Sequence, residues 1–129
     1  SVISIKEILP AVGQGALAIE VKKTNKLALN ALKNINDEKT YIAAMAERSF
    51  LRELEGGCQV PIGAFAEVKT DGLYLDGFVG EIDGSITFRK KIKGSKKNPE
   101  LLGKKLAGEM KKAGAGIVLK RIYNELRKK

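Results

Sequence analysis

The chain has 129 residues, 43% of them hydrophobic, so it can bury the core of one domain, or of one domain plus an extra piece, and disorder is not expected. The formal net charge of +9 favours an anionic partner, either nucleic acid or a polycarboxylate, although a solvated lysine-rich surface gives the same total. No apolar run approaches the roughly 20 residues that a membrane-spanning helix needs, so we expect no membrane partner.

The absence of histidine restricts the possible chemistry further. With no His and one Cys, the usual zinc ligand sets cannot be assembled, and no Cys–His or Ser–His catalytic pair is possible within this chain. No Asp/Glu loop has the spacing of a calcium site, so we expect no metal. A lone cysteine also excludes an intrachain disulfide and fits the reducing cytoplasm, where we expect the protein to reside.

Residues 1–36 form a pattern that is incomplete by itself. The apolar run at 16–21 predicts a buried strand, and Asn25 is placed to cap a helix that reaches about Ile35. A single strand and a short helix cannot form a core, because a lone strand has no backbone partner. This segment therefore either packs on the rest of the chain or belongs to a domain whose other strands lie elsewhere.

From residue 37 the pattern is typical of a complete α+β domain. Asp37 or Thr40 begins a helix that ends near Leu54, and three strand-like segments follow at 62–68, 73–82 and 86–92. Tight turns between these segments indicate an antiparallel sheet. Asn98 and Pro99 begin another helix, and a final helix follows a glycine-rich interruption at 114–116. We predict a three-stranded antiparallel sheet with helices on one face, and two units, 1–36 and 37–129.

The order helix, three strands, helix is also the topology of double-stranded RNA-binding domains. Lysines at 96–97 and 104–105 faintly resemble the cluster with which those domains read duplex shape and phosphates. A lysine-rich amphipathic helix is common, however, and no aromatic stacking platform accompanies this one. Binding of duplex RNA is therefore the alternative function.

The single cysteine, Cys58, lies on a tight connection, because two glycines precede it and Pro61 follows. It comes after the expected C-terminal end of a helix, where the helix dipole disfavours a thiolate, and no histidine can activate it. Cys58 is thus better suited to a single attachment reaction than to repeated nucleophilic turnover. The plain alternative is a buried free thiol that fills a gap in the core.

Two long motifs connect these observations. The first is PAVGQGAL at residues 10–17, and the second is AERSFLRELEGGCQVPIG at residues 46–63. They resemble, in order and separation, the segment that closes the catalytic core and the cofactor-attachment region of the porphobilinogen deaminase (hydroxymethylbilane synthase) family. The resemblance continues through residues 83–85 and the helix at 104–114, and so covers essentially the whole chain.

The resemblance implies an enzyme of haem biosynthesis that condenses four porphobilinogen molecules, with loss of ammonia, into hydroxymethylbilane. It implies a dipyrromethane cofactor held by a thioether to Cys58, and a growing pyrrole chain whose acetate and propionate groups suit basic residues. By the motif match, Gln14 and Gly15 line the active-site cleft and offer hydrogen bonds to pyrrole units. The alternative for Gly13 and Gly15 is a tight crossover into the following strand.

The chain departs from the family in size. Family members have three domains, and this chain lacks the segment that carries the catalytic aspartate and most substrate-binding arginines, so we expect no catalytic residue in it and no turnover by it alone. Residues 16–35 would be the returning strand and helix of the first domain, and residues 37–129 the cofactor-carrying third domain. An unpaired apolar strand invites association, so we expect that segment to be mobile or to pair with another chain.

Overall fold

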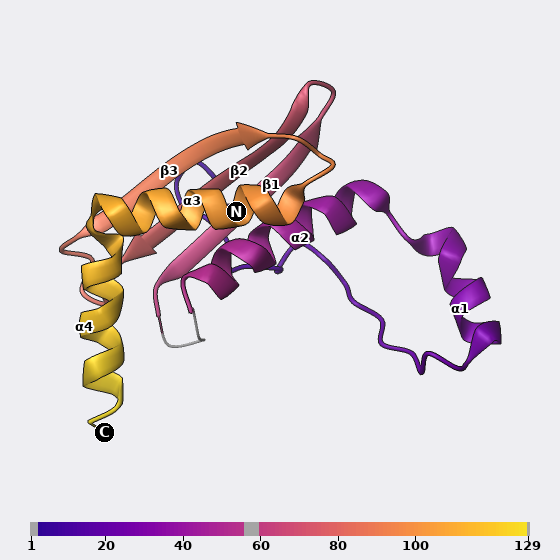
Figure 1. The fold of residues 1–129 in the computed structure, drawn as a ribbon, viewed down its shortest axis with the longest axis horizontal. Helices are drawn as coiled ribbons and strands as arrows, with labels where there is room; N and C mark the ends of the chain where they lie inside the picture. Colours follow the sequence, from indigo (N-terminus) through magenta and orange to yellow (C-terminus); the bar gives the residue numbers. More distant parts are fainter. Residues whose placement is uncertain (1–2, 56–59, 129) are drawn as a thin grey trace.

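A three-stranded antiparallel sheet in the order β1-β2-β3 organises the structure, a computed structural model that describes residues 3–55 and 60–128 (Figure 1). Its strands are β1 (Ile62–Lys69), β2 (Gly72–Gly80) and β3 (Thr87–Gly94). Helices α2 (Glu38–Glu53) and α3 (Pro99–Met110) lie side by side on one face of the sheet, and α4 (Gly116–Leu126) turns sharply away from the end of α3 (Figure 1). The predicted α+β fold is confirmed.

The two faces of the sheet follow from strict alternation along β2. Leu73, Leu75 and Val79 are fully buried beneath the helices, whereas Tyr74 and Asp76 lie on the opposite face. In the register of the sheet, Leu75 pairs with Ala66 of β1 and with Ile92 of β3, so the apolar face continues across all three strands. Strand β2 therefore has one buried face and one partly exposed face.

Helices α2 and α3 approach each other unusually closely at Gly103. A Cβ at position 103 would lie 2.7 Å from the backbone nitrogen of Phe50 and 2.8 Å from the Cβ of Ser49. Beside this crossing, the Ser49 hydroxyl donates a 2.8 Å hydrogen bond to the carbonyl of Glu100. Only glycine allows the two backbones this separation, and the crossing places Phe50 at the centre of the core, with no exposed surface.

The last two helices are joined by a wide π-helical turn, η2 (Lys111–Ala115), in which Gly114 takes a φ of +119°. A side chain at this position would be strained and would also meet the ring of Phe88, whose Cζ lies 3.1 Å from an added Cβ. The predicted interruption at 114–116 is thus a change of direction that lets α4 bury Val118, Leu119 and Ile122 against the domain.

The predicted strand at residues 16–21 is wrong. These residues form irregular chain, with Leu17 101% and Ile19 60% exposed, and no strand among residues 3–55 and 60–128 runs beside them. The physical reason is that a strand needs the backbone groups of a neighbouring strand, and the described chain offers none beside residues 16–21. The helix that follows is confirmed as α1 (Lys26–Leu32) with a 3₁₀ turn η1 (Lys33–Ile35), and the Asn25 side chain caps it.

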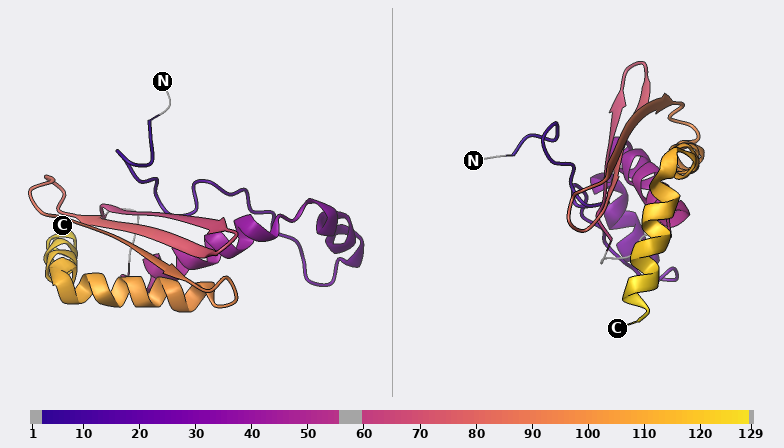
Figure 2. Two further views of the ribbon diagram at one scale, coloured as in Figure 1. Left: turned by 90° about the horizontal axis from the view of Figure 1, so that it is seen from above. Right: turned by 90° about the vertical axis from the view of Figure 1, so that its left-hand side faces the viewer.

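The N-terminal segment divides into two parts that behave differently. Residues 3–13 cross the sheet face opposite the helices (Figure 2), where the guanidinium of Arg89 donates to the carbonyls of Ile5, at 2.9 Å, and Lys6, at 2.7 Å. Residues 17–35 instead extend away from the sheet (Figure 1). The domain division at residue 36 remains a prediction, but the first part of the segment is bound to the C-terminal domain.

Two glycines of α3 provide a test of the close crossing. Gly103→Ala forces a methyl group into the backbone of α2, so we expect a loss of about 1–3 kcal/mol in the free energy of unfolding. Gly108→Ala places the same methyl group in open space and should raise the free energy of unfolding by about 0.5–1 kcal/mol through helix propensity. Urea unfolding measures both, and equal stability of the two variants would contradict the crossing.

Candidate functional site

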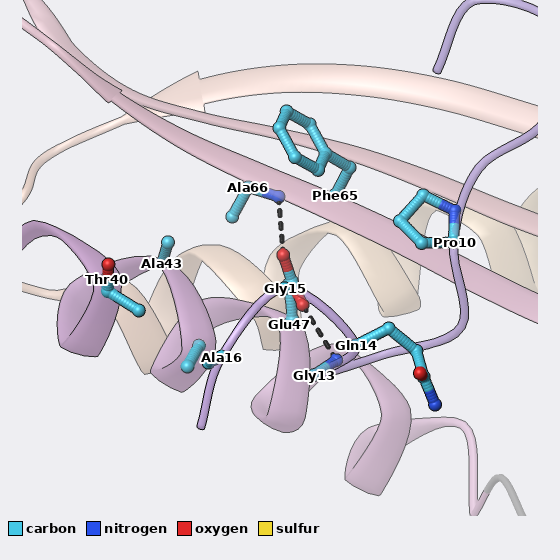
Figure 3. A pocket seen from close by; sticks show the side chains of 11 residues that line it. Pro10, Gly13, Gln14, Gly15, Ala16, Thr40, Ala43, Glu47, Phe65 and Ala66 are labelled. Carbon is cyan, nitrogen blue, oxygen red and sulfur yellow. Dashed lines mark hydrogen bonds between the residues drawn. The ribbon is translucent and has the colours of Figure 1, made fainter. Parts of the chain in front are cut away.

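The predicted site residues Gln14 and Gly15 lie on a turn at the edge of the sheet. The turn is closed by hydrogen bonds from the Gln14 amide to the Ala11 carbonyl and from the Ala16 amide to the Gly13 carbonyl, each of 3.3 Å. Gly13 has a φ of +78°, in the left-handed region that glycine favours. The turn, α2 and β1 enclose a pocket of about 350 Å³ (Figure 3).

Glu47, from the middle of α2, forms the polar floor of this pocket. Its side chain accepts a 3.0 Å hydrogen bond from the Gly13 amide through Oε2 and a 2.8 Å hydrogen bond from the Ala66 amide through Oε1 (Figure 3). The residue is only 8% exposed. Both oxygens therefore face backbone donors, and the carboxylate joins the turn to strand β1.

This arrangement provides hydrogen-bond acceptors for the outward N–H groups of edge strand β1. In the antiparallel ladder, alternate N–H groups of an edge strand point away from their neighbour and need partners when they are buried. On β1 the outward N–H of Ala64 donates to the carbonyl of Pro10, at 3.1 Å, and that of Ala66 donates to Glu47. The N-terminal segment and one acidic side chain thus complete the edge of the sheet.

Burial raises the pKa of the Glu47 carboxyl, and the hydrogen bonds from Gly13 and Ala66 act in the opposite direction. The carboxyl is therefore costly to ionise, and the two backbone donors are what make the ionised form acceptable. With both oxygens engaged in backbone hydrogen bonds, its evident role in this structure is to hold the turn.

The structure brings Gln14 and Gly15 to the wall of one pocket but leaves both residues exposed. In Figure 3 the Gln14 side chain extends away from Ala16 and Thr40. Their predicted hydrogen bonds to pyrrole units remain a prediction. The alternative, a tight crossover, fits the left-handed φ of Gly13, although no strand follows the turn.

Sequence reasoning missed Glu47, even though it lies within the quoted motif. The position of Glu47 in the sequence could have indicated its burial. It lies at helical spacing from three apolar residues, Ala43, Phe50 and Leu54, and so shares their face of the helix. An acidic residue on an apolar face is rarely buried without a specific hydrogen-bond partner. That partner could not be identified before the turn and β1 were placed beside α2.

Cys58 lies outside the described residues. The described chain at the C-terminal end of α2 is held by side chains from η2 and α4, which donate to its backbone carbonyls. Lys111 Nζ donates to the carbonyl of Glu53, and the Tyr123 hydroxyl donates to the carbonyl of Glu55 at 2.7 Å. Burial raises the pKa of Tyr123, which keeps its hydroxyl protonated as a donor.

A second pocket, of about 340 Å³, lies beside Glu55 and carries three cationic side chains in its lining: Lys111, Lys120 and Arg127. Such cations suit carboxylate groups. Over residues 3–55 and 60–128 no group of three or more Asp, Glu, Cys or His side chains is arranged to hold a metal ion. Within the same part of the chain, no helix has the length and apolar character required to cross a membrane.

The family model described as "Porphobilinogen deaminase, C-terminal domain" matches residues 41–112, a span that includes most of α2, the sheet and α3. The chain belongs to the porphobilinogen deaminase family. The resemblance inferred from the two motifs is thus confirmed, and the domain boundary of the matching model falls close to the start of α2.

Curated relatives named porphobilinogen deaminase agree with this assignment. The chain is 45% identical over 119 residues to the protein of Parasynechococcus marenigrum strain WH8102. The aligned region is 92% of the chain and 38% of that protein. The chain is 47% identical over 119 residues to the protein of Prochlorococcus marinus strain NATL1A, with the same coverage of 92% and 38%. The chain therefore spans little more than a third of the length of these relatives.

The raised pKa of Glu47 predicts a pH dependence of stability. Between the unfolded pKa, about 4.3, and the higher folded pKa, the folded chain keeps a proton that the unfolded chain has lost, so stability falls as pH rises through this window. Glu47→Gln should remove this component. Urea unfolding between about pH 4 and 8 should show a wild-type-minus-variant difference that changes within the window.

The matched control for this experiment is Glu125→Gln, which removes one formal charge from an exposed position of α4. Its difference from the wild type should lack the change seen with Glu47→Gln. A Glu47→Gln difference that stays constant over the whole pH range would contradict the raised pKa.

Proposed function

We propose that this chain is the cofactor-carrying C-terminal part of a hydroxymethylbilane synthase, and that Cys58 anchors the dipyrromethane primer through a thioether. The observation that carries the proposal is the family match over residues 41–112, because Cys58 is the only cysteine of the chain and lies inside that match. The whole protein would polymerise four porphobilinogen molecules into hydroxymethylbilane, in the cytoplasm, with porphobilinogen and the growing pyrrole chain as its partners.

The attachment is chemically simple and happens once. The Cys58 sulfur forms a bond to the methylene carbon of an aminomethylpyrrole, the carbon–nitrogen bond breaks, and the nitrogen leaves as ammonia with the thiol proton. No base in this chain must restore the sulfur afterwards, which agrees with the absence of histidine. A dipyrromethane also carries acetate and propionate groups, and the cations beside Glu55, three residues before Cys58, suit such carboxylates.

In the proposed function, Gln14 and Gly15 offer hydrogen bonds to pyrrole units. Their turn is exposed at the mouth of the first pocket, so the Gln14 amide and the Gly15 backbone remain accessible to a pyrrole unit. The duplex-RNA alternative gains no support from the matching family model or from the reported relatives, which are named porphobilinogen deaminase.

Intact-mass measurement of a full-length protein containing this chain tests the anchor directly. The wild type should carry an added mass of one dipyrromethane, and Cys58→Ser should lack it. The double variant Cys58→Ser/Ser85→Cys offers a thiol on the exposed turn between β2 and β3 and should also remain unmodified. An unmodified wild type, or an adduct on the relocated thiol, would refute a specific anchor at Cys58.

We further expect that the 129-residue chain alone does not convert porphobilinogen. The reason is that the family's catalytic aspartate and most substrate-binding arginines are expected outside it. Mass spectrometry after incubation with porphobilinogen should detect no hydroxymethylbilane, whereas the Parasynechococcus marenigrum protein, as the positive control, should form it. Measurable product from the isolated chain would show the expectation to be false.

The exposed apolar segment at 16–21 should promote association of the isolated chain. Leu17 and Ile19 are 101% and 60% exposed, so pairing with a second chain would bury them. Sedimentation should show concentration-dependent association of the wild type and weaker association of Leu17→Ser/Ile19→Ser. Ile117→Ser, at a position 68% exposed on α4, is the matched control and should associate like the wild type. A monomeric wild type would count against the proposal.

A further inference from the structure

Glu47 joins two segments that are far from it in the sequence. Gly13 lies 34 residues before it and Ala66 lies 19 residues after it, and each amide meets a different oxygen of the carboxylate. The three groups come from the N-terminal turn, from α2 and from the edge strand β1. A change at this one side chain therefore alters how the turn is attached to the domain.

We propose that Glu47 is a positioning residue that fixes the turn at residues 13–15, and with it Gln14 and Gly15, onto the domain that carries Cys58. The consequence for substrate binding rests on the proposed function, in which Gln14 and Gly15 contact pyrrole units. The attachment of the turn itself rests only on the two hydrogen bonds and the burial of Glu47.

The position of Glu47 along the N-terminal segment makes its role specific. Residues 5 and 6 are held by Arg89, and the Pro10 carbonyl is held by the Ala64 amide. The bond from the Gly13 amide is, among the described residues, the last hydrogen bond from this segment to the domain before the chain departs toward α1. Loss of the carboxylate would leave residues 5–10 attached and would release the turn alone.

The chemistry of the site requires two acceptor atoms. A carboxylate offers two oxygens, whereas the amide of glutamine offers one oxygen and one NH₂ group, which is itself a donor. Glutamine can therefore accept from the backbone N–H of Gly13 or of Ala66 but not from both. The other backbone N–H then faces the NH₂ group of glutamine, which is also a donor. Alanine satisfies neither and leaves a buried backbone N–H without its partner.

Helix α2 also links the turn to the anchor. Glu47 lies six residues before Glu53, the last residue of α2, which corresponds to about 9 Å along the helix. The end of α2 is held in turn by Lys111 and Tyr123. One rigid helix thus sets the separation between the turn with Gln14 and the point from which the chain continues toward Cys58.

Amide hydrogen exchange of the 129-residue chain, followed by NMR, tests the attachment without any cofactor. In Glu47→Ala, exchange at Gly13 and Ala66 should rise by about 10-fold or more relative to exchange at Ala64, whose acceptor is Pro10. In Glu47→Gln, one of the two amides should keep its protection and the other should lose it. Unchanged exchange at Gly13 in both variants would overturn the proposal.

Ser49→Ala is the matched control, because Ser49 is the other buried polar residue of α2 and bonds to α3 rather than to the turn. It should lower stability without changing the ratio of Gly13 to Ala64 exchange. An equal rise of that ratio in Ser49→Ala would show that the effect of Glu47 is general destabilisation, which would overturn the positioning role.

The full-length enzyme separates this inference from the proposed function. With Glu47→Gln, Cys58 should keep its adduct by intact mass, and KM for porphobilinogen should rise by about 10-fold, more than kcat falls, because the turn that meets the pyrrole chain is displaced. An unchanged KM would overturn the link from the turn to substrate. An absent wild-type adduct would refute the anchor while the exchange result still decides the positioning role.

Discussion

The structure around the candidate site depends on one constraint, namely that a buried backbone N–H must have a partner. Strand β1 is an edge strand beside the N-terminal turn, and the turn itself presents the Gly13 amide to the same space. Glu47 satisfies both donors with one carboxylate. Burial of that carboxylate is unfavourable and raises its pKa, and the two backbone hydrogen bonds act in the opposite direction by stabilising the ionised form.

Glu47 reaches this position because the core fixes the rotation of α2. Phe50 lies three residues further along the same face of the helix and packs against Gly77 of β2, where an added Cβ would come within 2.7 Å of the Phe50 ring. Gly103 then lets α3 press on α2 from the other side. Packing of Phe50 against Gly77, together with the close approach at Gly103, fixes the rotation of α2. The Glu47 side chain, about one turn earlier, is thereby directed to the edge of the sheet.

The parts of the fold that could be predicted from the sequence are those governed by local patterns. The tight turns identified the antiparallel sheet, and of the two predicted helix starts, Asp37 or Thr40, the structure uses Asp37, which accepts from the Thr40 amide at 2.7 Å. The strand at 16–21 failed because pairing is a non-local requirement, and apolar composition does not supply a neighbour. Glu47 was missed for the same reason, since its partners lie 34 and 19 residues away.

The contacts at the end of α2 also change the electrostatic argument about Cys58. From the sequence alone, the C-terminal end of a helix presents partly negative carbonyls, which disfavour a thiolate. In the structure the Lys111 ammonium and the Tyr123 hydroxyl occupy the carbonyls of Glu53 and Glu55, and Lys120 and Arg127 line the adjoining pocket. These donors reduce the negative potential of the two carbonyls, while the Glu53 carboxylate, 3.5 Å from Lys111 Nζ, balances part of the added positive charge. In the proposed role, the Cys58 thiol ionises only once, during attachment of the primer, and so needs less activation than a nucleophile that turns over repeatedly.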